Sequence, residues 1–171
     1  GETIENVAVS PGYLATLGAR LVEGRDFGTA DTDGAPGVAI VNQTMAARFW
    51  PGESALGHTI TSVTSGHTYR VVGVNADHKQ HGVLERPAPF VYLAATQRPS
   101  RYNFLVARTS GDASGLVASM RRELLALDPG LVVMDAGTME SHMAAALLPA
   151  RVGALLAGAF GGLGTLLAAI G

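Results

Sequence analysis

The residues whose types best suit chemistry are the histidines and the aspartate of one short polar stretch. The sequence ADHKQHG places Asp77, His78 and His81 close together. A paired-histidine zinc motif requires i,i+4 spacing on a helix, with a glutamate between the histidines. His78 and His81 instead stand at i,i+3 in a glycine-bounded polar loop without a further ligand nearby. We therefore interpret them as solvated loop histidines, with a metal-dependent hydrolase that uses His78 and His81 as the alternative.

Other catalytic motifs are missing from the sequence. It contains neither a G-x-S-x-G nucleophile elbow nor a G-x-x-x-x-G-K-[ST] phosphate-binding loop. The glycines from Gly158 to Gly164 have no lysine in register after them. Asp135 and Glu140 are explained by the preference of acidic side chains for helix starts. We therefore expect no enzymatic activity, no metal and no cofactor.

A glycine-rich loop after Arg25 carries Asp26, Asp31 and Asp33. These acids lack the ligand periodicity of a calcium-binding loop, so we expect a solvated surface loop. His58 and His67 flank a predicted hairpin and are interpreted as strand-edge residues, and we interpret His142, just before the C-terminal tail, as an interfacial residue.

Composition excludes several classes of protein. The 171 residues carry a formal net charge of −2, which gives no basic surface for a nucleic-acid partner. The absence of cysteine excludes disulfides and thiolate metal sites. The N-terminal sequence GETIENVAVS lacks the charged and apolar regions of a signal peptide. Mean hydropathy is +0.25, which is high for a protein wholly exposed to water, and most of the excess lies in the tail.

The first hundred residues alternate strand and helix signals. We predict a strand over 4–9, and a helix over 11–17 with Ser10 as N-cap and Pro11 in the first helical position. A buried strand over 38–41 precedes a helix that Asn42 caps. Runs at 58–63 and 68–74 predict a hairpin, and PFVYL predicts a further strand.

From Asn103 the pattern changes to strand, helix, strand. NFLVAR and LVVMD read as the strands, and the helix between them begins at an Asp112 cap and ends at Asp128. Its apolar stripe, which we expect to pack on a sheet, consists of Leu116, Met120, Leu124 and Leu127. A short helix over 139–148 follows. The predicted fold class is α+β.

The tail VGALLAGAFGGLGTLLAAIG holds twenty consecutive residues without a charge. Twenty helical residues reach about 30 Å, the thickness of the hydrocarbon core of a bilayer. One face of such a helix contains small residues at steps of four, and a G-x-x-x-G pair lies beside it; these positions are Gly153, Ala157, Gly161, Thr165 and Ala169, with Gly158 and Gly162. We expect a membrane helix whose small face packs against another helix, with Arg151 at the membrane interface.

Several phrases, taken in order, resemble one known family. They are VSPGYLATLGARLVEGRDF, VAIVNQTMAARFWPGESALG, YRVVGVNADHKQHG, RPAPFVYL, and RRELLALDPGLVV running through TMESHM into an apolar helix. The chain resembles the extracytoplasmic core domain of MacB-like permeases, which belong to the FtsX-like permease family of ABC transporters.

This resemblance implies a domain of two subdomains, inserted between the first and second membrane helices of a permease. It implies a β-rich subdomain over 1–101, the closing strand-helix-strand half of an α/β subdomain over 102–148, and the start of a transmembrane helix over 149–171. It implies that the chain ends partway into the second membrane helix, and that the first membrane helix and the opening half of the α/β subdomain lie outside it. The implied partners are a cytoplasmic ATPase subunit, other permease helices or a second permease half, and a periplasmic adaptor or substrate protein.

We therefore expect an extracytoplasmic fragment of an inner-membrane permease that couples the ATPase to export, lipoprotein extraction or hydrolase activation. The alternative from another class is a self-standing periplasmic binding module whose C-terminal helix is buried in its core.

Overall fold

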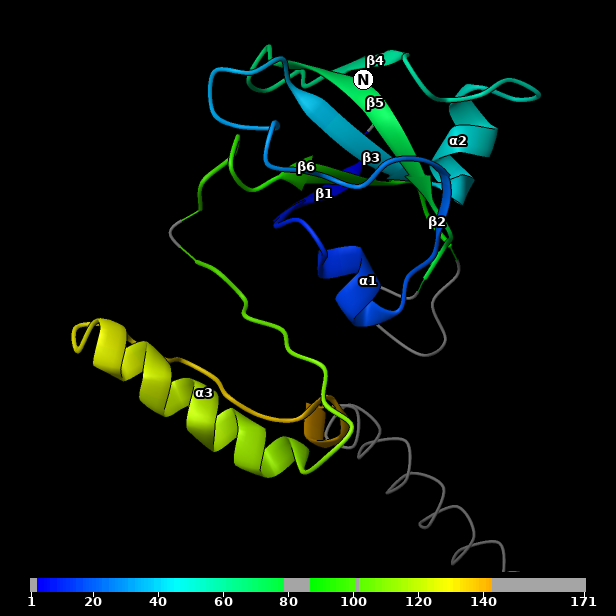
Figure 1. Cartoon of the computed structure of the whole chain (residues 1–171). Coiled ribbons are helices and arrows are strands. Elements are labelled where there is room, and N and C mark those ends of the chain that lie inside the picture. Colours follow the sequence, from blue (N-terminus) through cyan, green and yellow to red (C-terminus); the bar gives the residue numbers. More distant parts are fainter. Residues whose placement is uncertain (1–2, 79–86, 101, 143–171) are drawn as a thin grey trace, which may run out of the picture. The chain divides into compact units, whose positions relative to one another are not determined.

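The first of two compact units contains a mixed β-sheet with two short helices (Figure 1). The computed structural model of the chain describes residues 3–78, 87–100 and 102–142, and the two units are residues 1–108 and 109–171. The described elements of the first unit are β1 (Glu5–Val9), α1 (Tyr13–Leu17), β2 (Leu21–Gly24), β3 (Val38–Asn42), α2 (Gln43–Phe49), β4 (Thr59–Thr61), β5 (Thr68–Asn75) and β6 (Phe90–Ala94).

The sheet joins distant parts of the sequence. Its strand order is β1-β6-β3-β5-β2, and β4 pairs with β5 outside this path. The pairs β1–β6 and β3–β5 are parallel, whereas β3–β6, β2–β5 and β4–β5 are antiparallel. The mixed sheet confirms the predicted α+β class for this part of the chain, and β4–β5 is the predicted hairpin.

Two apolar clusters cover the two faces of the sheet. Alternate residues of β3 enter different clusters, because successive side chains of a strand point to opposite faces. Ala39 and Val41 belong to the cluster that contains Met45 of α2. Ile40 belongs to the cluster that contains Leu14 of α1. With an apolar layer on each face, every residue of β3 and of β6 is buried.

Asn42 caps α2, as predicted, and also joins this helix to the next strand of the sheet. Its Oδ1 accepts hydrogen bonds from the backbone N–H groups of Met45, at 3.0 Å, and of Phe90, at 2.9 Å. Its Nδ2 donates to the carbonyl of Ala88 at 2.8 Å. One buried side chain therefore fixes the start of the helix and the entry of β6.

The predicted N-terminus of α1 is wrong. The helix begins at Tyr13, and its N-cap is Gly12 in the left-handed region at φ 81°, without a side-chain cap. Gly12 can adopt this φ without a steric penalty, so the chain turns there, two residues beyond Ser10. The predicted C-terminal end at Gly18 is confirmed, since Gly18 is the left-handed C-cap.

The main helix in the described part of the second unit is α3 (Ala113–Leu127), and residues 139–142, where the predicted helix over 139–148 begins, are also helical. Its predicted ends are confirmed: the Asp112 side chain accepts from the N–H groups of Ser114 and Gly115, and Asp128 is the C-cap. The predicted burial of its apolar stripe is wrong for the structure described, because no residue of α3 is buried. The sheet that should cover the stripe is not present in the described part of this unit.

Two predicted strands are not strands in the structure. Neither 103–108 nor 131–135 has strand structure, and the side chains of Phe104 and Val132 are 91% and 84% exposed. A strand requires a neighbouring chain to receive its backbone hydrogen bonds, and the described residues provide none for these two segments.

No helix in residues 3–78, 87–100 and 102–142 combines the length and the apolar character needed to cross a membrane. The predicted membrane helix falls after residue 142 and therefore lies outside the described residues.

Candidate functional site

The loop that follows β2 is ordered by a buried carboxylate. Asp31, which is 4% exposed, accepts two hydrogen bonds from the Arg25 guanidinium, at 2.7 and 2.8 Å, and one from the N–H of Gly28. The hydrogen bonds from Arg25 lower the pKa of Asp31, against the opposing effect of its burial. The prediction of a solvated loop is therefore wrong for Asp31, because this carboxylate is buried against Arg25. The sequence alone does not indicate that Arg25 binds Asp31.

We expect Asp31→Asn to lower the free energy of unfolding by about 2 kcal/mol at pH 7, since it removes a bidentate pair whose arginine is half exposed. The pKa of Asp31 is lower in the folded than in the unfolded chain. The stabilisation is therefore complete above the unfolded pKa of about 3.9 and is lost as the pH falls through the folded pKa. Urea unfolding at several pH values measures it. Asp33→Asn is the control, and an equal loss in both variants would contradict the assignment.

Gln97 ties the same loop to the sheet. Its Oε1 accepts from the N–H of Val38 at 3.1 Å, while its Nε2 donates to the carbonyls of Thr32, Ala35 and Pro36 at 3.3, 3.5 and 3.1 Å. Thr96, beside it, donates its hydroxyl to the carbonyl of Asp31. The loop therefore has a fixed conformation between its two ends.

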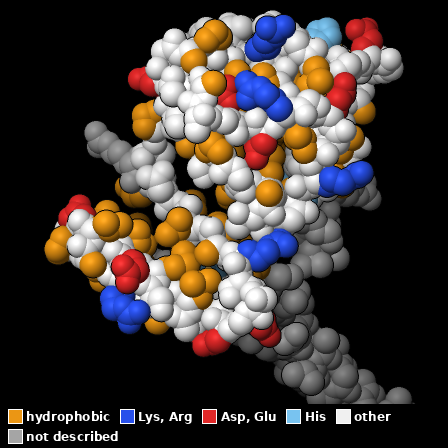
Figure 2. Space-filling model, viewed as in Figure 1, with side chains coloured by type: hydrophobic (Ala, Val, Ile, Leu, Met, Phe, Trp, Pro, Cys, Tyr) orange, Lys and Arg blue, Asp and Glu red, His pale blue; other side chains and the backbone are white. Residues whose placement is uncertain are grey.

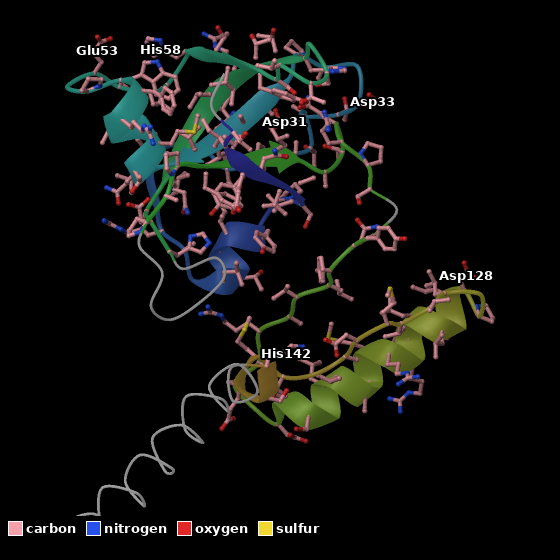
Figure 3. The ribbon with its side chains drawn as sticks, turned by 180° about the vertical axis from the view of Figure 1, so that it is seen from behind. Asp31, Asp33, Glu53, His58, Asp128 and His142 are labelled. Carbon is pink, nitrogen blue, oxygen red and sulfur yellow. The ribbon has the colours of Figure 1, made fainter. Side chains whose placement is uncertain are left out.

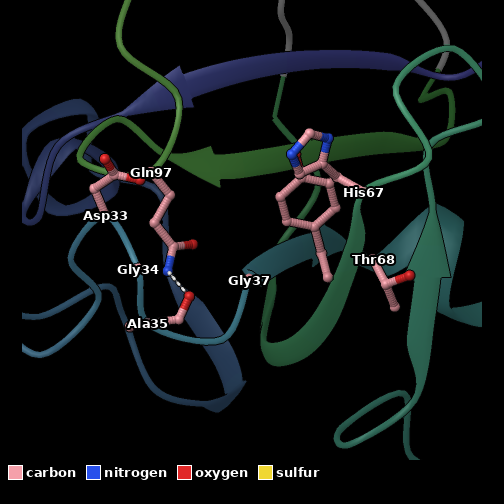
Figure 4. A pocket seen from close by; sticks show the side chains of 8 residues that line it. Asp33, Gly34, Ala35, Gly37, His67, Thr68 and Gln97 are labelled. Carbon is pink, nitrogen blue, oxygen red and sulfur yellow. Dashed lines mark hydrogen bonds between the residues drawn. The ribbon is translucent and has the colours of Figure 1, made fainter.

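A polar pocket of about 260 Å³ lies between this loop and the β4–β5 hairpin (Figure 4). Its lining residues are Asp33, Gly34, Ala35, Gly37, His67, Thr68, Tyr69 and Gln97. The His67 ring stacks on the buried Tyr69 ring at 6.5 Å between centroids. The phenol oxygen of Tyr69 accepts a hydrogen bond from Arg98 at 3.1 Å. The pocket thus combines a carboxylate with aromatic rings.

His78 is held inside a polar network and is not a solvated loop residue. Its Nδ1 lies 3.1 Å from Asn75 Nδ2 and its Nε2 lies 3.3 Å from the hydroxyl of Tyr92, with the two rings stacked. Asn75 and Tyr92 are both fully buried residues of the sheet, so these contacts hold the imidazole against the sheet. His81 lies outside the described residues. Within those residues, no group of three His, Asp or Glu side chains is placed to hold a metal ion.

The other histidines make local contacts. His58 stacks on Trp50 at 5.3 Å and lies 3.9 Å from the carboxylate of Glu53 (Figure 3). In the second unit, His142 Nε2 lies 2.8 Å from Asp135 Oδ2, and its Nδ1 lies 2.9 Å from the carbonyl of Thr138. The hydrogen bonds to Thr138 and Asp135 raise the pKa of His142. His142 thus clamps a helical turn, and Asp135 is its partner.

The structure brings only some of the predicted residues into sites. The proposed helix-packing residues, Arg151, Gly153, Ala157, Gly158, Gly161, Gly162, Thr165 and Ala169, all lie outside the described residues. Asp33 and His67 were noted in the sequence as a loop acid and a strand-edge residue, and the fold places them in one pocket. Gln97 lines the same pocket, but no sequence signal predicts this, because the three residues are far apart in the chain and only the folded sheet brings them together.

Comparison with known proteins agrees with the fold. The family model for the MacB-like periplasmic core domain matches residues 1–123. The periplasmic region of MacB from Actinobacillus actinomycetemcomitans has a similar structure, with a TM-score of 0.53 and 16% identity, over 71% of this chain and 56% of that one. The extracellular domain of the noncanonic ABC-type transporter YknZ from Gram-positive bacteria gives a TM-score of 0.54 and 18% identity, over 79% and 70%.

At 16% and 18% identity, the two solved structures support the fold alone. This chain spans little more than half of the length of the MacB periplasmic region. No curated protein matches the sequence. The family match, however, extends over most of the chain and includes every strand of the described sheet. The chain belongs to the family of MacB-like periplasmic core domains.

Proposed function

We propose that this chain is the extracytoplasmic domain of an ABC transporter permease, without catalysis of its own. In this proposal a separate cytoplasmic ATPase supplies the energy, and the permease transmits the ATPase cycle to a process outside the cytoplasm. The observation that carries the proposal is the family match over residues 1–123. The absence of a phosphate-binding loop from the sequence is consistent with an ATPase on another chain.

The apolar surface of the second unit supports a larger assembly. Figure 2 shows hydrophobic side chains at the surface of this unit. The most exposed of them are Leu127, Val132, Met134 and Met139. Exposed apolar surface of this kind usually marks an interface. We propose that another segment of the same permease covers α3 and supplies the partner strands that 103–108 and 131–135 lack.

The tail is proposed as the membrane helix that joins the domain to the permease. This proposal rests on the sequence, because the tail lies outside the described residues. Its small residues would let a second helix approach closely at Ala157 and Gly161. Movement of that second helix would then reach the extracytoplasmic domain through the short connection around Pro149.

We expect Ala157→Leu, made in the whole permease with its ATPase, to reduce transport-linked ATPase stimulation several-fold. Leucine would prevent the close approach of the second helix while it makes the tail more hydrophobic, so membrane insertion should be preserved. The measurement is ATP hydrolysis in proteoliposomes, with membrane fractionation to verify insertion.

Ala159→Leu is the matched control. At about 100° per residue, Ala159 falls on the opposite side of the proposed helix from Ala157, so this variant adds the same side chain without blocking the small face. Full stimulation in both variants would contradict the proposed packing face. A tail that did not fractionate with membranes in the unaltered protein would instead favour a binding module with a buried C-terminal helix.

A further inference from the structure

The pocket beside Gln97 contains a carboxylate that the fold does not use. The other two acids of the same loop are both engaged: Asp26 accepts from the N–H groups of Gly12 and Phe27, and Asp31 accepts from Arg25. Asp33 is exposed, and within the described residues it has neither a hydrogen-bond nor an ion-pair partner. None of the eight lining residues is a lysine or arginine. The pocket therefore presents the negative charge of Asp33. The neighbouring Arg98 donates to the phenol oxygen of Tyr69 and forms no ion pair with Asp33.

The opposite wall of the pocket is aromatic. Figure 4 shows Asp33 and Gln97 on one side and His67 with Thr68 on the other. The Tyr69 ring approaches the backbone so closely that a Cβ on Gly37 would lie 3.0 Å from its Cδ1 and 2.6 Å from the carbonyl oxygen of Thr68. Glycine at position 37 thus leaves room for the Tyr69 ring and the Thr68 carbonyl beside it. A flat cation can stack on such a wall while it reaches a carboxylate.

The pocket is formed in advance of binding. Gln97 holds the 32–36 segment through its amide, and the hydroxyl of Thr96 holds the carbonyl of Asp31. The hairpin side is held by the pairing of β4 with β5. Little binding free energy would therefore be spent on ordering the protein, so a ligand with a small contact area could still bind.

Size and chemistry select the class of ligand. A volume of about 260 Å³ is below the range of roughly 300–1,000 Å³ of cofactor and drug-sized sites, so a single long side chain suits it better. An anion would be repelled by Asp33. A metal ion would find only Asp33 and His67 as typical ligands in the lining. Between lysine and arginine, the planar guanidinium both stacks on rings and pairs with a carboxylate through two hydrogen bonds.

We propose that this pocket binds an arginine side chain of a partner protein, with Asp33 pairing with the guanidinium and the exposed His67 ring, backed by the buried Tyr69 ring, forming the stacking wall. The proposal depends on the geometry of the first unit and is independent of ATPase coupling. It assigns the loop after β2 as a recognition element for a protein that presents arginine.

The test measures binding of N-acetyl-L-arginine amide to the 171-residue chain by NMR titration of backbone amides. We expect saturable shifts at Gly34, Gly37 and Thr68, and binding at least about threefold tighter than that of N-acetyl-L-lysine amide. Asp33→Asn should weaken arginine binding about fivefold, the value expected for loss of a charge-assisted pair with an exposed carboxylate. His67→Ala should weaken it by a smaller factor.

Glu53→Gln is the matched control. It removes one exposed carboxylate from the same unit but not from the pocket lining, so arginine binding should change less than about twofold. Equal weakening by Asp33→Asn and Glu53→Gln would overturn the proposal, because it would indicate attraction to net charge alone. Equal affinity for the arginine and lysine amides, or saturable binding of inorganic phosphate at the same amides, would also overturn it. An unchanged melting temperature in Asp33→Asn verifies that the variant is folded.

Discussion

Replacing Asn42 with alanine is expected to lower the free energy of unfolding by about 3 kcal/mol, because two buried hydrogen bonds and one partly buried hydrogen bond are lost together. The substitution leaves the N–H groups of Met45 and Phe90 and the carbonyl of Ala88 without their partner. Asn42 is only 5% exposed, so water cannot easily replace the amide. Urea unfolding gives the change as a lower midpoint at constant slope.

The control for this experiment is Asn103→Ala. Asn103 is exposed and donates one hydrogen bond, to the carbonyl of Ser100. Its loss should change the free energy of unfolding by less than about 0.5 kcal/mol. A third variant, Asn42→Asp, keeps both acceptor bonds but places a carboxylate oxygen against the carbonyl of Ala88, so it should also lose stability. If Asn42→Ala were as stable as Asn103→Ala, the side chain would not hold the helix and the strand together.

Gly24→Ala is expected to destabilise the first unit by about 3–4 kcal/mol, from a strained backbone and a steric clash. Gly24 ends β2 at φ 78°, and a Cβ there would lie 2.2 Å from the carbonyl oxygen of Val72 and 2.9 Å from Cα of Gly73. Both contacts are with the backbone of β5, which cannot move without breaking its pairing with β2 or β3. Thermal and urea unfolding measure the loss.

Gly52→Ala separates the two causes. Gly52 has nearly the same φ, 79°, but its added Cβ would meet nothing within 4 Å. This variant should lose only the backbone contribution, about 1 kcal/mol. Similar losses at the two positions would mean that β5 moves to accommodate the Cβ at position 24.

Local signals in the sequence were enough for some of the fold and insufficient for the rest. The cap at Asn42, the end of α1 at Gly18 and the cap at Asp112 each depend on a few adjacent residues, and each was predicted. The left-handed N-cap at Gly12 competed with an adjacent Ser-Pro pair that has the same local pattern as a helix start. Sequence rules could not choose between them.

Contacts between distant residues could not be predicted in this way. Gln97 reaches the loop before β3 only because β6 lies beside β3 in the sheet, and no periodic pattern encodes that neighbour. The apolar stripe of α3 was predicted to pack on a sheet, but no residue of α3 is buried in the structure described, because a stripe does not identify what covers it. For the same reason the pocket at Asp33 was unseen in the sequence, since its two walls come from separate elements.

The position of β6 has a consequence for how the domain is made. β1 has β6 as its sheet neighbour, with Glu5 opposite Phe90, so the earliest strand of the described sheet can pair only after the latest one has been synthesised. At about 5–20 residues per second, that interval is on the order of several seconds during translation. For that time β1 has an unsatisfied edge that could pair with another chain. Such long-range pairing also slows folding. We therefore expect mutations in β6 to reduce the yield of folded protein, because they prolong the time in which the edge of β1 can pair with another chain.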